Sequence, residues 1–103
     1  MIDISLKTDD KSFDLFVNGH AGYGKKGQDI VCAAVSALVQ TLAACLDKMS
    51  SYYDVDYDEN GVIKHIGATG KNAAIACEVI MYGLNKIAFS YPENVSISAD
   101  RYE

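Results

Sequence analysis

The stretch NGHAGYGKKGQDIVCAAVSALVQTLAACL, from Asn18 to Leu46, decides how the chain folds. Its first part, which we call the glycine loop (residues 19–27), holds four glycines in nine residues: Gly19, Gly22, Gly24 and Gly27. Clustered glycines indicate backbone that turns sharply or passes close to another group. The second part, residues 30–46, is rich in alanine and aliphatic side chains and predicts a helix. The stretch therefore predicts a tight loop that leads into a long apolar helix.

The start of this helix carries the residue types of a cysteine nucleophile. Asp29 is a natural N-cap, since its carboxylate can accept from first-turn amides that have no partner within the helix. Cys32 is then the third helical residue, where the positive end of the helix dipole favours a thiolate. His20, twelve residues earlier on the glycine loop, is placed to fold back and take the thiol proton. A cysteine, a base and a helix start together predict nucleophilic catalysis.

Two blocks of this stretch resemble the bacterial ribosomal-processing cysteine proteases. They are Gly19-His20-Ala21 and the sequence DIVCAAVS at residues 29–36. Residues late in the chain agree with the last helix of that family and its exit, namely Gly83-Leu84, Ile87-Ala88 and Tyr91-Pro92. The likeness covers essentially the whole chain, and DIVCAAVS is its specific part.

The resemblance implies a small homodimeric protease of the cytoplasm. Such a protease removes a short N-terminal extension from a ribosomal protein of the large subunit with a Cys–His pair. Carried over position by position, the resemblance implies Cys32 as the nucleophile and His20 as the general base. We place Gly19, Asp29 and Ser36 around this pair as supporting or substrate-binding residues.

The surroundings of Cys32 suggest further roles. Cys32, Ser36 and Gln40 are spaced by four and share one stripe of the predicted helix, where a groove open to solvent or a helix–helix contact could run. First-turn amides, together with amides of the glycine loop, are expected to form the oxyanion hole. The glycine loop is expected to close over substrate. Asp29 could also orient His20, but its charge beside a thiolate would oppose ionisation, so we favour the cap.

The rest of the chain predicts strands and one more helix. Residues 2–7 and 13–17 alternate apolar and polar side chains, and they are expected to pair as a hairpin. Residues 52–58 and 62–68 predict a second hairpin. Its turn is Asn60-Gly61, the favoured two-residue turn in which both residues take positive φ. Gly67 is expected to mark a bulge.

The remaining elements complete the predicted fold. Helical spacing returns from residue 72, Pro92 stops that helix, and residues 95–97 predict a short last strand. The order ββαββα, with a possible final β, predicts an α+β fold. Its four- to five-stranded sheet carries two helices packed on it, and residues 1–103 form a single domain.

Composition limits the kinds of partner and the cellular compartment that fit this chain. The net charge of −5 argues against nucleic-acid binding and suits a basic partner. Three cysteines without a C-x-x-C pair argue against a disulfide framework and for a reducing compartment. The first residues carry no secretory signal, and no apolar run is expected to reach bilayer-spanning length, although residues 30–46 come closest. We therefore expect a cytoplasmic protein without membrane contact. The apolar first helix of so small a domain also predicts a homodimer.

Two other functions fit parts of the sequence. Gly22, Gly24 and Gly27 match G-x-G-x-x-G, so a phosphate or nucleotide could sit at the helix start. That fingerprint normally begins where the strand ends and places its third glycine inside the helix, and neither holds here. A P-loop is excluded because Gln28-Asp29 follows Gly27. The other alternative is a non-enzymatic, ribosome-associated binding module with a vestigial Cys–His pair.

No cofactor or metal is expected. The possible zinc ligands His20, Cys32, His65 and Cys77 lack ligand spacing. Residues 56–61 match the opening of an EF-hand loop, but its twelfth position is a glycine instead of the bidentate glutamate. Cys45 and Cys77 align with apolar positions of the two predicted helices, which is typical of inert core thiols.

Overall fold

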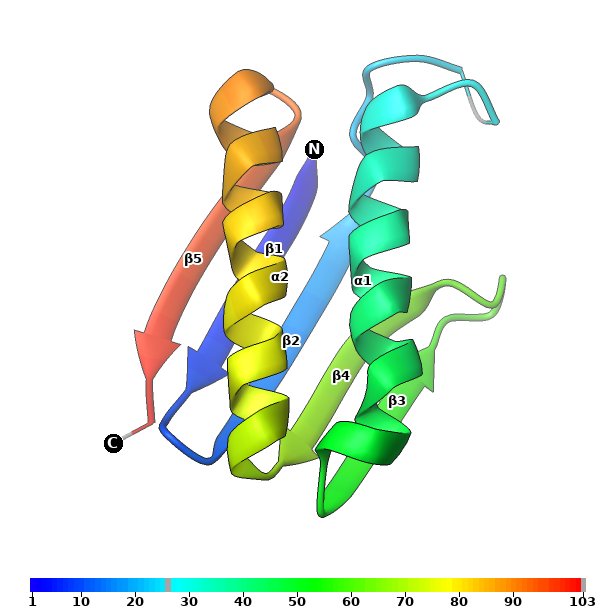
Figure 1. Cartoon of the computed structure of the whole chain (residues 1–103). Helices are drawn as coiled ribbons and strands as arrows, with labels where there is room; N and C mark the ends of the chain where they lie inside the picture. Colours follow the sequence, from blue (N-terminus) through cyan, green and yellow to red (C-terminus); the bar gives the residue numbers. More distant parts are fainter. Residues whose placement is uncertain (26, 103) are drawn as a thin grey trace.

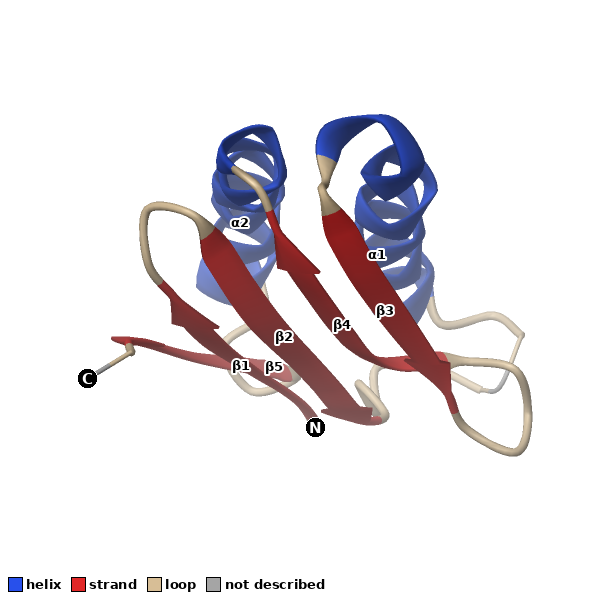
Figure 2. Ribbon diagram, turned by 90° about the horizontal axis from the view of Figure 1, so that it is seen from below, coloured by secondary structure: helices blue, strands red, loops and turns tan. Residues whose placement is uncertain are grey.

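The computed structural model describes residues 1–25 and 27–102, and it shows a five-stranded sheet with two helices on one face (Figures 1 and 2). Its elements, in chain order, are β1 (Ile2–Thr8), β2 (Ser12–Gly19), α1 (Ile30–Met49), β3 (Tyr52–Tyr57), β4 (Ile63–Thr69), α2 (Lys71–Ser90) and β5 (Val95–Arg101). The predicted α+β class and the order ββαββαβ are thereby confirmed.

The sheet topology brings distant segments to one end of the molecule. The strand order is β3-β4-β2-β1-β5, with β1/β2 and β3/β4 as the two predicted antiparallel hairpins. The last strand runs parallel to β1 after the crossover through α2. Ile2 pairs with both Gly19 and Val95, so the exit of β2 and the start of β5 lie beside each other. The first turn of α1 and the last turn of α2 lie at this same end (Figure 1).

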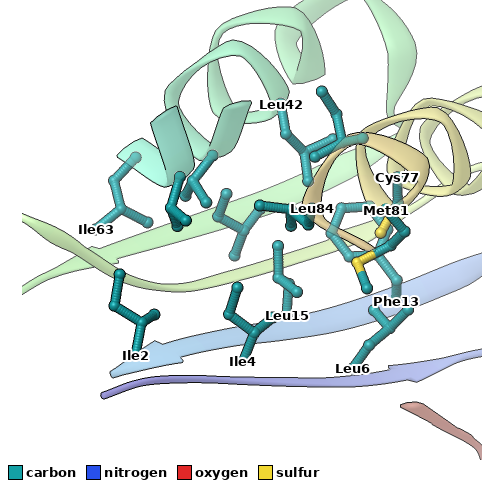
Figure 3. Packing of buried hydrophobic residues seen from close by; sticks show 14 of the residues in the cluster. Ile2, Ile4, Leu6, Phe13, Leu15, Leu42, Ile63, Cys77, Met81 and Leu84 are labelled. Carbon is teal, nitrogen blue, oxygen red and sulfur yellow. The ribbon is translucent and has the colours of Figure 1, made fainter. Parts of the chain in front are cut away.

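The core lies between the sheet and the helices. In β1, Ile2, Ile4 and Leu6 are buried and the residues between them are exposed, as the period of two predicts. Figure 3 shows these side chains and those of β2 pointing toward Leu42 and Leu84 of the helices. The buried stripe of α1 consists of Val31, Val35, Val39, Leu42 and Leu46. Since each fully buried aliphatic side chain contributes about 1.5–3 kcal/mol, this packing holds α1 in place more than helix propensity does.

The expectation that no apolar run reaches bilayer-spanning length is wrong. Both α1 and α2 are long and apolar enough to cross a bilayer by length and composition alone. Each nevertheless buries a stripe in the layer between helices and sheet, as a core helix does. The helices also pack closely on each other. A Cβ at Gly83 of α2 would lie 2.8 Å from Leu38 Cδ1 of α1.

The prediction of a two-residue turn at Asn60-Gly61, between β3 and β4, is also wrong. The strands are joined by residues 58–62, and only Gly61 among these has a positive φ, of +78°. The Asp58 carboxylate accepts from the amides of Asn60 at 2.8 Å and Val62 at 3.0 Å. This side-chain bonding supports a longer turn and removes the need for a positive φ at Asn60.

Gly67 marks a close contact instead of a bulge. The irregular pairing between β3 and β4 falls at Asp56/Tyr57. A Cβ at Gly67 would lie 2.8 Å from Asp14 Oδ1 and 3.1 Å from His65 Cε1. The glycine therefore leaves room for the pair formed by these two side chains.

His65 is the centre of a cluster on the sheet face that the helices leave uncovered. Its Nε2 lies 2.8 Å from Asp14 Oδ1, and its Nδ1 lies 2.9 Å from Asp56 Oδ2. The Phe16 ring stacks on the imidazole at 4.6 Å, and the Tyr102 hydroxyl donates to Asp14. Both ring nitrogens can donate to carboxylates only when the imidazole is protonated. Burial lowers the pKa of His65, but the bonds and charges of the two aspartates outweigh it, so that the pKa is raised.

The His65 cluster predicts a pH-dependent stability. An unfolded histidine titrates near pH 6.5, so a raised pKa in the fold stabilises the protein fully below about pH 6.5. That contribution is lost as the pH rises through the folded pKa. In urea unfolding, His65→Gln should lower the free energy of unfolding by roughly 1 kcal/mol at pH 6 and by less at pH 8. His20→Gln, the matched control, should lose stability between these pH values as the unmodified protein does. Equal effects of His65→Gln at both pH values would contradict the assignment.

Candidate active site

Cys32 lies in the first turn of α1, partly covered by the glycine loop. The amide of Ala21, from the root of that loop, donates to Cys32 Sγ at 3.3 Å. The loop therefore folds back onto the helix start, as the sequence predicts.

Asp29 joins the helix to the loop. One carboxylate oxygen accepts from the amides of Val31 and Cys32, both at 3.0 Å, so the predicted N-cap is confirmed. The other oxygen accepts from the amides of Tyr23 at 3.0 Å and Gly24 at 3.2 Å. These bonds, with that from Cys32 the largest, hold the pKa of Asp29 below its usual value. All four donors are backbone amides, so the carboxylate orients the loop and not His20.

This use of Asp29 leaves few donors for other ligands. The first-turn amides of Val31 and Cys32 bond its carboxylate, and the amide of Ala33 donates to its carbonyl at 3.0 Å. The expected oxyanion hole cannot draw on these amides while the cap is formed. A phosphate at the helix start would meet the same occupied donors and the negative charge of Asp29. The geometry thus opposes the phosphate-binding alternative, whose motif also includes Lys26, outside the described residues.

His20 lies at the same end of the molecule as Cys32 but is not joined to it. It follows Gly19, whose φ is +92°. The backbone carbonyl of Met1 occupies the place of a Gly19 Cβ, so glycine is required at that position. In the described part of the chain, no hydrogen bond links the exposed His20 to Cys32. Hydrogen bonds from the amides of Val62 and Asn60 hold the pKa of Asp58, in the turn between β3 and β4, below its usual value, and the charge of His20 adds the smallest contribution.

Ser36 lies one helical turn beyond Cys32. Its hydroxyl accepts from Gln40 Nε2 at 2.7 Å. Cys32 and Ser36 are partly exposed and Gln40 is exposed, which agrees with a polar stripe open to solvent along α1.

Two contacts from the connection between α2 and β5 were not predicted. Asn94 Nδ2 donates to the Ala21 carbonyl at 2.9 Å. The Tyr91 ring meets the Tyr23 ring edge-on, with centroids 5.2 Å apart. The sequence marks residues 91–92 only as a helix stop, so no local signal points to contacts with the glycine loop.

The other two cysteines have no comparable surroundings. Burial raises the pKa of the Cys77 thiol to about 12, which makes it inert at physiological pH. Cys45 is partly buried and donates to the Leu42 carbonyl at 3.2 Å. Cys32 is therefore the reactive candidate among the three free cysteines.

A thiol at a helix start beneath a glycine loop, on a two-layer α+β scaffold, defines the class as cysteine-dependent enzymes. Residues 1–96 match the model of a family described as cysteine protease Prp. The chain belongs to this family, and it is a cysteine protease.

The relatives agree with this assignment over nearly their full lengths. The chain is 33% identical over 101 residues to the ribosomal processing cysteine protease Prp of Staphylococcus aureus (strain Mu50), covering 94% of this chain and 95% of the relative. It is 33% identical over 93 residues to the Prp of Mycoplasma genitalium, with coverages of 86% and 90%. The crystal structure of Prp from S. aureus with a covalently linked product peptide superposes with a TM-score of 0.85 at 30% identity. That match covers 96% of this chain and 99% of the S. aureus chain.

The double role of Asp29 can be separated by two substitutions. Asp29→Ala should lower the Tm by about 5 °C, because both the cap and the loop contacts are lost. Asp29→Asn should keep most of the Tm, since asparagine also caps helices, but its single carbonyl oxygen cannot serve both sides. Amide hydrogen exchange at Tyr23 and Gly24 should then accelerate in both variants.

Asp47→Ala, at the exposed far end of α1, serves as the control and should change neither the Tm nor the exchange of the loop. Unchanged exchange at Tyr23 and Gly24 in Asp29→Asn would show that the carboxylate does not hold the loop.

Proposed function

We propose that this protease removes the short N-terminal extension of a ribosomal protein of the large subunit, with Cys32 as nucleophile and His20 as general base. The observation that carries the proposal is the bond from the Ala21 amide to Cys32 Sγ at a helix start. Relatives at 33% identity are named ribosomal processing cysteine proteases, which supports the substrate class.

The proposed reaction proceeds through an acyl-enzyme. His20 takes the Cys32 proton, and the thiolate attacks the scissile carbonyl, so that an S–C bond forms and the carbonyl π electrons move to oxygen. The oxyanion collapses, the C–N bond breaks, and the leaving amine takes the proton from His20. Water then attacks the thioester, which releases the carboxylic acid and restores the thiol.

This reaction requires His20 to move toward Cys32. In the described part of the chain His20 is exposed and makes no hydrogen bond to Cys32, which we interpret as a resting state. The flanking glycines at positions 19 and 22 have φ values of +92° and +69°, a region that few other residues adopt. We propose that substrate binding closes the glycine loop and completes the Cys–His pair.

Charge supports the choice of substrate. The chain carries a net charge of −5, whereas proteins that bind RNA, as ribosomal proteins do, are generally basic. Attraction between opposite charges raises the rate of encounter between enzyme and substrate. Membership of a protease family favours this enzyme over a ribosome-associated module without catalysis.

Cys32→Ala should abolish cleavage, by at least about a thousandfold, because no other group can form the acyl-enzyme. The measurement is mass spectrometry of the full-length ribosomal protein, with its N-terminal extension, after incubation with each variant. The unmodified protein should release one defined N-terminal peptide. Cys45→Ala, on the same helix, should cleave at the normal rate. Equal cleavage by Cys32→Ala would overturn the proposed nucleophile.

We further propose that the protein acts in the cytoplasm as a homodimer paired through its helices. The outer side of α2 exposes apolar side chains at helical spacing, among them Val79 at 61% and Phe89 at 86% exposure. A hollow of about 490 Å³ between α1 and α2 is lined mostly by apolar residues, among them Ile75 and Val79, together with Thr41 and Asn72. Exposed apolar surface of this kind is typical of an interface.

Val79→Asp should convert the dimer to a monomer, because a carboxylate buried in an apolar contact loses its hydration. Light scattering gives the mass of each variant directly. Lys11→Glu, in the turn between β1 and β2 and away from the helices, should leave the dimer intact. A monomeric mass for the unmodified protein would rule out this part of the proposal.

A further inference from the structure

Asn94 reaches the glycine loop from a firmly held backbone position. Its amide donates to the Tyr91 carbonyl at 3.0 Å, and its carbonyl accepts from the amide of Ile2 at 2.9 Å. These two bonds fix Asn94 between the last turn of α2 and the first residue of β1. Its side-chain Nδ2 then donates to the Ala21 carbonyl at 2.9 Å.

Ala21 is the residue through which Asn94 can influence Cys32. It is 2% exposed, although residues 22–25 and 27 of the loop are exposed. Its carbonyl is held by Asn94, and its own amide donates to Cys32 Sγ at 3.3 Å. Ala21 is buried and bonded on both sides, so the two peptide units that flank its Cα are both held in the resting structure.

Four of the neighbouring amides bond Asp29 instead. Asp29 holds those of Val31 and Cys32 in the helix and those of Tyr23 and Gly24 in the loop. Ala21 supplies the amide that points at the sulfur. When the thiolate attacks, the carbonyl oxygen that gains the charge lies two bonds from Sγ. A donor already in contact with the sulfur needs only a small shift to reach that oxygen.

We propose that the Ala21 amide stabilises the oxyanion and that Asn94 is the positioning residue that holds it there. The inference rests on the proposed function for the existence of the oxyanion. Asn94 does not touch substrate in this scheme. It acts through the backbone of Ala21, whose C=O and N–H belong to the two peptide units on either side of the Cα, and its loss should affect the step in which charge moves from sulfur to oxygen.

The first test is steady-state cleavage of a peptide that spans the processing site. Asn94→Leu has a similar size, no donor and no charge, so it should lower kcat by about tenfold to a hundredfold and change KM less than about twofold. Asn94→Gln keeps the amide donor on a longer side chain and should recover part of the loss. Asp47→Leu, at the exposed far end of α1 and outside the hollow between the helices, should cleave like the unmodified protein.

The second test needs no substrate. Alkylation of Cys32 by iodoacetamide, followed against pH, reports how well the thiolate is stabilised. Asn94→Leu should shift the midpoint of this profile to higher pH, because the Ala21 N–H no longer points at Sγ, and Asn94→Gln should shift it less. Cys32→Ala, carrying Cys45 and Cys77 alone, gives the background labelling.

The outcomes separate the two proposals. A shifted alkylation profile in Asn94→Leu, in a protein that cleaves no ribosomal substrate, would support the positioning role and reject the proposed function. A normal kcat and a normal profile in a folded Asn94→Leu would overturn the positioning role. If Asn94→Leu and Asn94→Gln lost the same amount of kcat as each other and the same amount of Tm, without a shift of the alkylation profile, the positioning role would also be overturned. Asn94 would then be a purely structural residue.

Discussion

The geometry around Cys32 depends on one carboxylate, which accepts hydrogen bonds from four backbone amides. By bonding two amides of α1 and two of the glycine loop, Asp29 sets the distance between loop and helix. The same contact has an electrostatic consequence. A negative charge at the N-cap offsets the positive end of the helix dipole at the first turn of α1.

The scaffold makes this arrangement possible through strand pairing. Because Ile2 pairs with Gly19 on one side and Val95 on the other, three chain segments meet at one end of the sheet. The glycine loop leaves β2 there, and the connection that carries Asn94 enters β5 there. The core beneath them is continuous from β1 to both helices (Figure 3). The packed sheet thus supports the glycine loop, which has almost no apolar side chains of its own.

Local patterns predicted most of the fold and part of the site. Alternation and helical spacing identified all the strands and both helices, and Asp29 was correctly predicted as the N-cap. The predictions failed where contacts between residues far apart in the sequence determine the structure. The Asn94 contact spans 73 positions, and the Asp14–His65 pair spans 51. Gly67 is explained by that pair alone, and the turn at Asn60 by the side chain of Asp58.

The pairing of Ile2 with Gly19 also determines how the protein can be handled. The carbonyl of Met1 lies against Gly19, so the first residue of the chain stands at the same end of the sheet as Cys32 (Figure 1). A purification tag or a fusion partner attached there begins beside the glycine loop. Tyr102 lies at the opposite end of the sheet, where its hydroxyl donates to Asp14. Labels, affinity handles and surface immobilisation are therefore best attached after Tyr102, at the end of the sheet away from Cys32.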